Sequence, residues 1–203
     1  MAGPRLTGVL LLGGASRRFG SPKALARIGG ETLAERLWAV LGEACDERLA
    51  VGKAADALPL PLPLLDDGTP LRHPAAGIVA ALRAAAHDVC VFVPVDCPFV
   101  TADAVRALGD ACAGAEAAVV EATRPLPGAL RRSTLPVFEQ CLAGEAPLGD
   151  ALARLDVATA AVDPALLADA DTPDELERLL SAGLPWSTSA SGPIPNPHPP
   201  KGK

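Results

Sequence analysis

The sequence predicts a single three-layer α/β/α domain built on a largely parallel sheet. Two continuous apolar runs, residues 6–12 and 89–95, have the pattern of strands covered on both faces, which is typical of parallel sheets. Weaker strand candidates alternate with segments of helical periodicity, and this alternation indicates βαβ units. With 203 residues, of which 49% are hydrophobic and 21% charged, the chain is long enough for one such domain with a sizeable core.

The other helices and strands are expected from shorter local patterns. Thr32 and Glu35 form a capping box before an apolar stripe of helical spacing, so a helix is expected over residues 33–44. Thr172 as N-cap and Pro173 at the first helical position mark a second clear helix start, before Gly183. Further helices are expected over residues 76–86, 102–113 and 134–142, and further strands over residues 48–51, 62–65, 117–121 and 157–162.

Two segments interrupt this alternation. Residues 52–74 are rich in Pro and Asp, and they are expected to form a long loop that contains only the short strand; loops of that length are often functional. Residues 185–203 hold six prolines among 19 residues, which is typical of a flexible tail. We therefore expect one folded domain over residues 1–184 and a Pro/Ser-rich tail over residues 185–203.

Composition and charge argue against several classes of function. The net charge is −6, from 18 Lys+Arg and 24 Asp+Glu, and aromatic residues make up 3%, whereas a nucleic-acid binder normally has a basic stripe and stacking aromatics. The five cysteines are an odd number without a C-x-x-C pair, which indicates reduced thiols rather than a disulfide framework or zinc knuckle. Because no apolar run is long enough for a signal peptide or membrane span, we expect a cytoplasmic protein without nucleic-acid or membrane partners.

A glycine-rich, basic loop follows the first expected strand. Gly13 and Gly14 leave the strand, and Arg17, Arg18 and Lys23 come shortly after them. Glycines let backbone N–H groups approach a phosphate closely, and the basic side chains add positive charge. The string is neither a Walker A loop nor the dinucleotide-binding G-x-G-x-x-G pattern. It predicts a clamp for a nucleoside triphosphate.

Carboxylates occur at two further places. Asp96 follows the strand at residues 89–95, and in open α/β sheets ligands bind beyond the carboxyl ends of strands, so Asp96 is expected beside the glycine-rich loop. Asp169 and Asp171 lie just before the helix that Thr172 caps. Alternate residues of an extended segment point to opposite faces, so one of the two is expected to reach a metal, and we favour Asp171. Carboxylate oxygens suit Mg²⁺, which Asp96 and Asp171 are expected to bind.

Nucleophilic hydrolase chemistry is not indicated. Ser16 does not lie in a G-x-S-x-G motif, and Cys97 has no His near it in the sequence that would activate a thiolate. Cys97 is therefore expected to be a small packing residue.

In this order and spacing, the motifs resemble those of the molybdenum cofactor guanylyltransferase family, the MobA-like members of the NTP-transferase superfamily. The matching strings are the loop at residues 13–23, H-P-A-A-G-I at 73–78, V-D-C-P at 95–98 and D-A-D-T-P-D-E-L at 169–176. Residues 124–144 resemble the family segment that contacts the acceptor. The resemblance covers about residues 6–182 and implies a Rossmann-like fold of the nucleotide-diphospho-sugar transferase type.

The resemblance also implies an activity and a set of site residues. The reaction would be Mg²⁺-dependent transfer of GMP from GTP to the phosphate of the molybdopterin cofactor, with release of pyrophosphate. The catalytic residues would be Lys23, Arg18 and Asp96, and the nucleotide-contacting Asp of the family corresponds to Asp66 or, preferably, Asp67. The implied nucleotide site consists of Leu11, Leu12, Gly13, Gly14, Ser16, Arg18, Lys23, Asp67 and Asp96.

Alternatives remain open on the sequence. The Gly13-Gly14 pair favours a guanine nucleotide, but Asp169-x-Asp171 looks more like the cytidylyl branch, and Gly52 stands where guanylyl members often have a base-contacting Asn. A cytidylyltransferase using CTP, another small-metabolite or sugar-phosphate nucleotidyltransferase, and a non-catalytic nucleotide-binding protein are therefore the competing hypotheses. Transient contact with cofactor-synthesis proteins or with molybdoenzymes is a further expectation from the resemblance.

Overall fold

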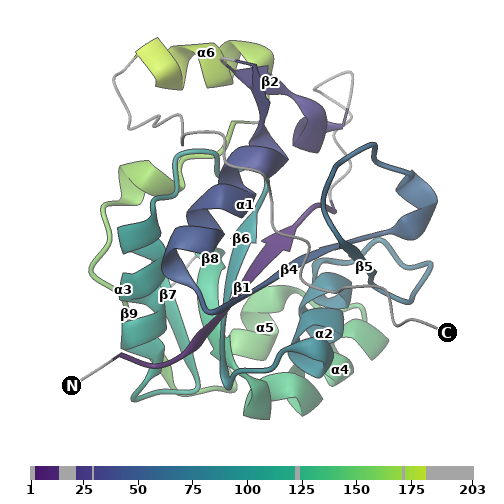
Figure 1. Cartoon of the computed structure of the whole chain (residues 1–203). Coiled ribbons are helices and arrows are strands. Elements are labelled where there is room, and N and C mark those ends of the chain that lie inside the picture. The colour runs from purple at the N-terminus through teal and green to yellow at the C-terminus, as the bar shows by residue number, and fades with distance from the viewer. Residues whose placement is uncertain (1–2, 14–21, 29, 122–123, 171, 182–203) are drawn as a thin grey trace, which may run out of the picture.

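A seven-stranded, mostly parallel sheet forms the centre of the protein in the computed structural model, which describes residues 3–13, 22–28, 30–121, 124–170 and 172–181. The strands lie in the order β5-β4-β1-β6-β8-β7-β9 (Figure 1). All neighbouring pairs are parallel except those of β8, which runs antiparallel to both β6 and β7. The sheet strands are β1 (Leu6–Leu11), β4 (Glu47–Gly52), β5 (Leu64–Asp66), β6 (Val89–Pro94), β7 (Ala117–Glu121), β8 (Arg124–Arg131) and β9 (Val157–Thr159).

Helices cover both faces of this sheet, which gives three layers. The helices α1 (Leu33–Ala44) and α3 (Ala102–Cys112) pack together on one face, while α2 (Pro74–Ala84), α4 (Leu135–Ala143) and α5 (Leu148–Leu152) cover the other. The last helix, α6 (Pro173–Ser181), lies near the small hairpin of β2 (Arg27–Ile28) and β3 (Glu31–Thr32) at the top of Figure 1. Short 3₁₀ helices occur at Lys23–Leu25, Ala54–Asp56, Arg132–Thr134 and Pro164–Leu167.

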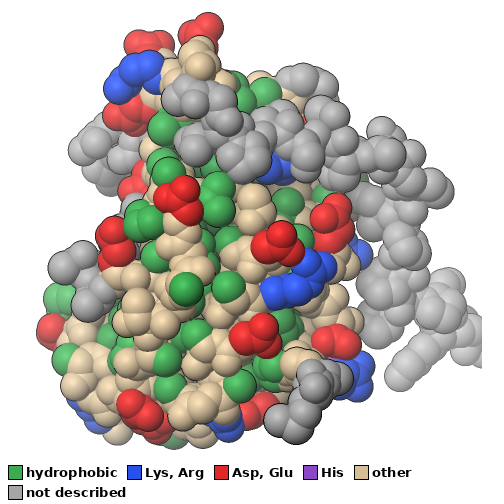
Figure 2. All heavy atoms as spheres, turned by 90° about the vertical axis from the view of Figure 1, so that its left-hand side faces the viewer, with side chains coloured by type: hydrophobic (Ala, Val, Ile, Leu, Met, Phe, Trp, Pro, Cys, Tyr) green, Lys and Arg blue, Asp and Glu red, His purple; other side chains and the backbone are tan. Residues whose placement is uncertain are grey.

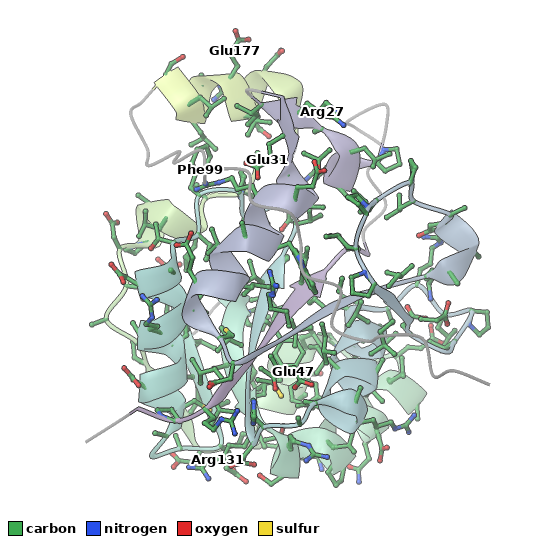
Figure 3. All side chains as sticks on the ribbon, viewed as in Figure 1. Arg27, Glu31, Glu47, Phe99, Arg131 and Glu177 are labelled. Atoms are coloured by element: carbon green, nitrogen blue, oxygen red, sulfur yellow. The ribbon has the colours of Figure 1, made fainter. Side chains whose placement is uncertain are left out.

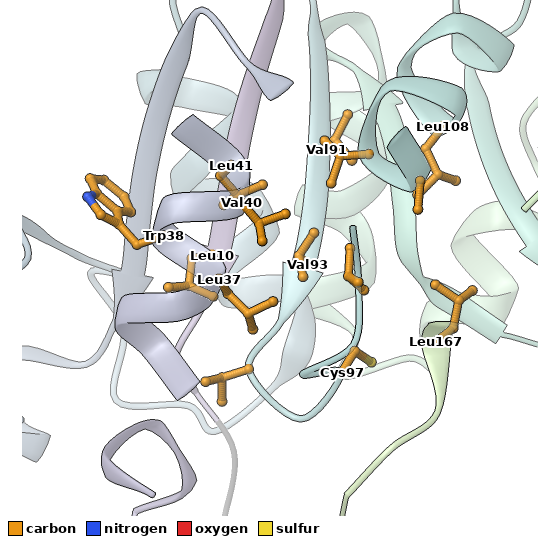
Figure 4. Close-up of a cluster of buried hydrophobic side chains, with 14 of the residues drawn as sticks. Leu10, Leu37, Trp38, Val40, Leu41, Val91, Val93, Cys97, Leu108 and Leu167 are labelled. Atoms are coloured by element: carbon orange, nitrogen blue, oxygen red, sulfur yellow. The ribbon is translucent and has the colours of Figure 1, made fainter. Parts of the chain in front are cut away.

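Strand β6 shows how one apolar run supplies two cores. Successive side chains of a strand point to opposite faces of the sheet. Accordingly Val91 and Val93 belong to the core on the α1 and α3 side, and Cys90 and Phe92 belong to the core under α2 and α4. Figure 4 shows the first of these cores, in which side chains from α1, α3, β1 and β6 form one cluster. The continuous apolar run in the sequence is therefore explained by burial on both faces.

The expected elements are confirmed, with ends that differ by a few residues. The α1 helix begins at the predicted capping box: Thr32 Oγ1 accepts from the Glu35 backbone N–H at 3.1 Å, and Glu35 Oε2 accepts from the Thr32 N–H at 2.9 Å. The same reciprocal pair joins Thr172 and Glu175 at the start of α6, with distances of 3.0 and 3.2 Å. Thr101 caps α3 as well. These local patterns are sufficient to predict where each helix begins, because both partners of each capping bond lie within one helical turn.

Strand β8 and helix α5 were not expected from the sequence. The prolines Pro125 and Pro127 argue against a strand, because proline lacks the N–H that an interior strand must donate. Both lie at the start of β8, before its pairing with β6, which runs from Gly128 opposite Phe92 to Arg131 opposite Val89. The ladder with β7 is irregular at this point, between Val119 and Glu121. The prolines are thus placed where the β6 ladder does not need their donors.

The face shown in Figure 2 carries acidic side chains scattered among apolar and uncharged ones, with separate groups of Lys and Arg side chains between them. Such a face does not resemble the basic stripe of a polyanion-binding surface. Within the described part of the chain, all helices are too short or too polar to cross a membrane.

Candidate functional site

A cavity of about 530 Å³ opens where several strands of the sheet end. Its volume is in the range of cavities that bind small molecules. Its walls come from the ends of β4, β1 and β6, the loop after β5, the N-terminus of α2 and the start of β8. The lining residues are Leu11, Gly13, Val51, Gly52, Lys53, Asp67, Arg72, His73, Pro74, Gly77, Pro94, Asp96, Cys97, Pro125, Leu126, Leu148 and Asp169. This is the edge of an α/β sheet at which ligands bind.

The end of β1 supplies the first wall of the cavity. Leu11 and Gly13 line it, and a Cβ atom built on Gly13 would meet no heavy atom within 4 Å among the described residues, so the backbone there is open to a ligand. Leu12 turns the other way, because its side chain belongs to the core on the α1 side. The predicted phosphate-binding residues Gly14, Ser16 and Arg18 lie outside the described residues, as does Arg17.

Lys23 begins the 3₁₀ helix that follows the glycine-rich loop. Its side chain is buried, with 8% of the residue exposed. A lysine is seldom buried without a partner. Lys23 is not among the described residues that line the cavity.

Asp96 lies directly beyond β6, as the sequence predicts. Its carboxylate, the Asp169 carboxylate and the Cys97 thiol bring one ligand atom each within 4.8 Å of one another. Cys97 Sγ lies 3.6 Å from Asp96 Oδ1 and 3.7 Å from Asp169 Oδ1. The backbone joins the two segments as well, since the Ala170 N–H donates to the Asp96 carbonyl at 3.0 Å.

The second acid expected beside Asp96 is Asp171, which lies outside the described residues, so its place beside Asp96 stays a prediction. Among the described residues, the structure brings Asp169 to Asp96. The sequence signal for Asp169 was present in the Asp169-x-Asp171 pair, and alternation along an extended segment could not say which of the two faces the site. Cys97 is 1% exposed and belongs to the apolar core drawn in Figure 4, which fits its predicted packing role.

The turn after Asp96 rests on a buried arginine. Arg36, on α1, is 2% exposed, and its Nε donates to the Pro98 carbonyl at 2.9 Å. Burial lowers the pKa of this guanidinium, while the charge of Glu31 opposes that effect. In Figure 3, Phe99, the residue after Pro98, and Glu31 appear in the upper part of the view, and Glu47 and Arg131 appear in the lower part. The sequence did not predict Arg36, because a polar residue on the inner face of a helix has no recognisable pattern.

Asp67 occupies the opposite wall of the cavity. Its carboxylate accepts from Lys53 Nζ at 3.0 Å through Oδ1 and at 2.8 Å through Oδ2. The adjacent Asp66 does not line the cavity; it accepts from the backbone N–H groups of Ala54 and Gly68, both at 2.6 Å, and these bonds hold its carboxyl pKa below the ordinary value. Of the two acids that the sequence left open, Asp67 is the one in the cavity wall.

His73 and the start of α2 complete this end of the cavity. His73 Nδ1 accepts from the Ala75 N–H at 3.1 Å and so caps the helix. Arg72 pairs with Asp56 at 2.6 Å, and this pairing raises the pKa of the guanidinium. At the other end, the apolar side chains of Leu126 and Leu148 face the cavity from β8 and α5.

The order of the strands arranges these groups in a row. Neighbouring strands lie about 4.8 Å apart, so the three steps from β5 through β4 and β1 to β6 separate the loop of Asp67 from that of Asp96 by about 14 Å. The start of β8 is one step further. A ligand that spans the cavity therefore meets Asp67 first, then Gly13, then the Asp96 cluster and last the β8 segment.

The donor set of the cluster suits a divalent cation. Two carboxylates offer the hard oxygen ligands that Mg²⁺ prefers, and such an ion usually keeps several waters and adds substrate phosphates as ligands. The Cys97 sulfur is a softer ligand and is not required for this. With an open backbone at Gly13 beside it, the arrangement can hold a polyphosphate and stabilise charge on it.

Comparisons with known proteins agree with this geometry. Residues 8–159 match the family model described as the MobA-like NTP transferase domain. The chain is 31% identical over 193 residues to a probable molybdenum cofactor guanylyltransferase of Rhodopirellula baltica, which covers 86% of this chain and 92% of the relative. A second relative with the same description, from Carboxydothermus hydrogenoformans, is 33% identical over 140 residues and covers 68% of this chain and 71% of its own.

Solved structures share the fold. Molybdopterin-guanine dinucleotide biosynthesis protein A from Archaeoglobus fulgidus superposes with a TM-score of 0.74 at 22% identity, over 87% of this chain and 98% of its own. The 2-C-methyl-D-erythritol 4-phosphate cytidylyltransferase of Thermus thermophilus superposes with a TM-score of 0.62 at 19% identity, over 86% of this chain and 97% of its own. The family model matches residues 8–159, and the alignment with the first relative covers 86% of this chain and 92% of the relative. This chain therefore belongs to the MobA-like NTP transferase family of nucleotidyltransferases.

Proposed function

We propose that this enzyme transfers GMP from GTP to the terminal phosphate of the molybdopterin cofactor, with Mg²⁺ at Asp96, and releases pyrophosphate. The observation that carries the proposal is the row of groups across the cavity. The Asp96 and Asp169 carboxylates lie between the end of β1, which we assign to phosphate binding, and the segment at the start of β8. A site in which an acceptor phosphate meets a nucleotide α-phosphate needs its acidic cluster at that middle position.

The reaction needs little covalent chemistry from side chains. A phosphate oxygen of the acceptor forms a bond to the α-phosphorus, and the bond from that phosphorus to the bridging oxygen breaks, so pyrophosphate leaves with the electron pair. Asp96 and Asp169 would hold Mg²⁺, which when bound neutralises charge on the phosphates. The backbone at Gly13 and the charges of Arg18 and Lys23 are assigned to the triphosphate. Positioning and electrostatic stabilisation supply most of the catalysis.

The choice of guanine and of the acceptor follows the relatives and the first motif. Two curated relatives that cover most of their own length with this chain are described as probable molybdenum cofactor guanylyltransferases. The Gly13-Gly14 pair, which follows β1 in the sequence, supports a guanine nucleotide through the family resemblance. Leu126 and Leu148 offer an apolar wall for the organic part of an acceptor.

Pyrophosphate release tests the proposal directly. Purified protein is incubated with Mg²⁺, with GTP, CTP, ATP or UTP, and with the molybdopterin cofactor or a panel of sugar phosphates. We expect release with GTP and the molybdopterin cofactor, and loss of release when Mg²⁺ is removed by a chelator. A CTP preference would assign the chain to the cytidylyl branch. Pyrophosphate release with a sugar phosphate but not with the molybdopterin cofactor would show that the acceptor is a sugar phosphate.

A variant control separates catalysis from contamination. Asp96→Asn should abolish release, whereas Asp103→Asn, which changes a carboxylate that is 96% exposed on α3, should not. Nucleotide binding without pyrophosphate from any combination would contradict catalysis and favour the non-catalytic alternative.

A further inference from the structure

The ion pair of Lys53 and Asp67 is largely enclosed by the protein. The side chains are 12% and 8% exposed, and the shortest distance between Nζ and Oδ2 is 2.8 Å. Removing two charges from water costs several kcal/mol per ion in proteins, and apolar residues of similar volume often replace such a pair without loss of stability. A pair retained in the wall of a ligand cavity therefore points to a role in binding rather than in folding.

The pair lies at the end of the cavity away from the acceptor. Lys53 directly follows β4, and Asp67 directly follows β5, which is the edge strand of the sheet. The phosphate-binding end of β1 and the Asp96 cluster come next in the row, and the β8 segment comes last. When the α-phosphate of a nucleotide lies at Asp96, its base extends toward Lys53 and Asp67.

The hydrogen bonds of the pair leave one acceptor position open. Lys53 Nζ has three N–H donors and directs them at Asp67 Oδ1, Asp67 Oδ2 and the Thr69 carbonyl, the last at 2.7 Å. Asp67 Oδ1 also accepts from the Thr69 N–H at 3.2 Å. Among the bonds of the described residues, Oδ2 accepts only from Lys53, so it can take one more N–H donor. Lys53 thus holds the carboxylate in a single orientation and neutralises its charge.

We propose that Lys53 is a positioning residue for nucleotide selection, which orients Asp67 so that its carboxylate accepts an N–H from the base. The inference rests on the proposed function and adds the residue that sets base preference. Guanine carries hydrogen on ring nitrogen N1 and on its 2-amino group, and both can be donated to a carboxylate. Adenine has a lone pair at N1, which an acceptor-only carboxylate repels. The orientation set by Lys53 therefore favours GTP over ATP, two nucleotides of nearly equal size.

The test compares kcat/KM for GTP and ATP in the wild type, Lys53→Met, Lys53→Arg and Asp67→Asn. In Lys53→Met the ratio of GTP to ATP should fall by at least about tenfold, the scale of one lost base contact. The loss should appear mainly in KM for GTP, because the reacting phosphate lies about 14 Å away. Asp67→Asn should also lower the GTP-to-ATP ratio, since an amide can donate to adenine N1. Lys53→Arg, which keeps a positive donor beside Asp67, should retain the ratio that Lys53→Met loses. Arg83→Gln removes an exposed pair with Glu139 on α2 and α4 and serves as the matched control.

The outcomes separate this inference from the proposed function. If Lys53 has only a structural role, Lys53→Met should lower Tm and should lower kcat/KM for GTP and for ATP by the same factor. An unchanged ratio of kcat/KM for GTP to that for ATP would therefore overturn the inference. A wild type that uses ATP as well as GTP would overturn it also, while the nucleotidyltransferase activity stands. If the wild type releases no pyrophosphate at all, equilibrium binding of GTP and ATP to the same variants gives the ratio independently of turnover.

Discussion

The backbone around Asp96 is tied to three other segments, which explains why this carboxylate can occupy a defined place. The Val95 N–H donates to the Leu11 carbonyl at 3.0 Å, and the Ala170 N–H donates to the Asp96 carbonyl at 3.0 Å. From the other side, Arg36 holds the Pro98 carbonyl. A ligand group is effective when its own position is set by such supporting contacts.

Substitution of this residue should separate activity from stability. Asp96→Asn keeps the shape of the side chain but removes the negative charge, so turnover should fall at least about a hundredfold, the effect of several kcal/mol of lost metal stabilisation. The melting temperature should change little, because Asp96 is only partly buried and its carbonyl bond to Ala170 is retained. Steady-state pyrophosphate release and thermal unfolding measure the two quantities. A variant with wild-type turnover would exclude Asp96 as a metal ligand.

Three cysteines should be unreactive in the folded protein. Burial raises the pKa of the Cys45 and Cys90 thiols to about 12 and that of Cys112 to about 11. The thiolate is the reactive form, so at pH 8 alkylation of these residues should be slow and should rise only toward their pKa values or on unfolding. Peptide mass spectrometry after iodoacetamide treatment of native and denatured protein measures this. Rapid labelling of Cys90 in the native state would contradict its burial.

At the scale of elements, a hydrogen bond from Arg36 connects helix α1 to the turn after β6. The capping box at Thr32 and Glu35 fixes where α1 begins, and this start determines which helical turn carries Arg36. Arg36 then reaches across to Pro98 on the turn that follows Asp96. The N-terminal cap of one helix therefore affects the position of a carboxylate that is distant in the sequence.

Arg36→Met tests this connection. The substitution leaves the Pro98 carbonyl without its donor, which should destabilise the fold by about 1–3 kcal/mol. Loss of the same bond loosens the turn that carries Asp96, so the Mg²⁺ concentration for half-maximal turnover should rise.

Arg48→Met is the matched control, because Arg48 also donates to a backbone carbonyl, that of Trp38 at 3.0 Å, and stacks over the Trp38 ring away from the cavity. It should lose stability with an unchanged Mg²⁺ requirement. Urea unfolding and Mg²⁺ titration of turnover are the measurements, and equal Mg²⁺ requirements in both variants would refute the connection.

At the scale of the whole molecule, one antiparallel strand brings the acceptor side to the site. β8 enters the sheet between β6 and β7, and its start, with Pro125 and Leu126, reaches the cavity beside the Asp96 cluster. A purely parallel order would place the carboxyl end of a strand here instead. Because β8 runs antiparallel to β6, its start, rather than its end, lies beside the Asp96 cluster and forms the last wall of the cavity in the row.

Gly128 makes this insertion possible. A Cβ atom at this position would lie 2.7 Å from the Pro125 carbonyl oxygen and 3.1 Å from that of Ala118, and backbone atoms cannot move away cheaply. Gly128→Ala should therefore cost more than about 2 kcal/mol of stability, measured by urea unfolding. Gly114→Ala, where a Cβ atom meets nothing within 4 Å among the described residues, should cost less than about 0.5 kcal/mol. Similar costs at both positions would contradict the close approach.

Much of the layered fold can be predicted from local sequence patterns, whereas elements that depend on distant partners cannot. The run at residues 89–95 predicted β6, because burial on both faces leaves no polar position in the strand. β8 was missed because Pro125 and Pro127 are unfavourable in a strand, and only the register with β6 and β7 places them outside the β6 ladder. The strands and caps that could be predicted depend on neighbours within a few residues, and β8 depends on partners in the sheet.

The candidate site divides in the same way. By itself, the sequence determined the α/β class, the helix starts and the position of Asp96 at a strand end, because periodicity, capping and the order of strands and helices are properties of neighbouring residues. Asp67 was selected only by the resemblance to the family. Only the tertiary structure decided that Asp169 approaches Asp96, that Lys53 pairs with Asp67 and that Arg36 supports Pro98. These contacts join residues that lie far apart in the sequence or on different elements, and packing brings them together.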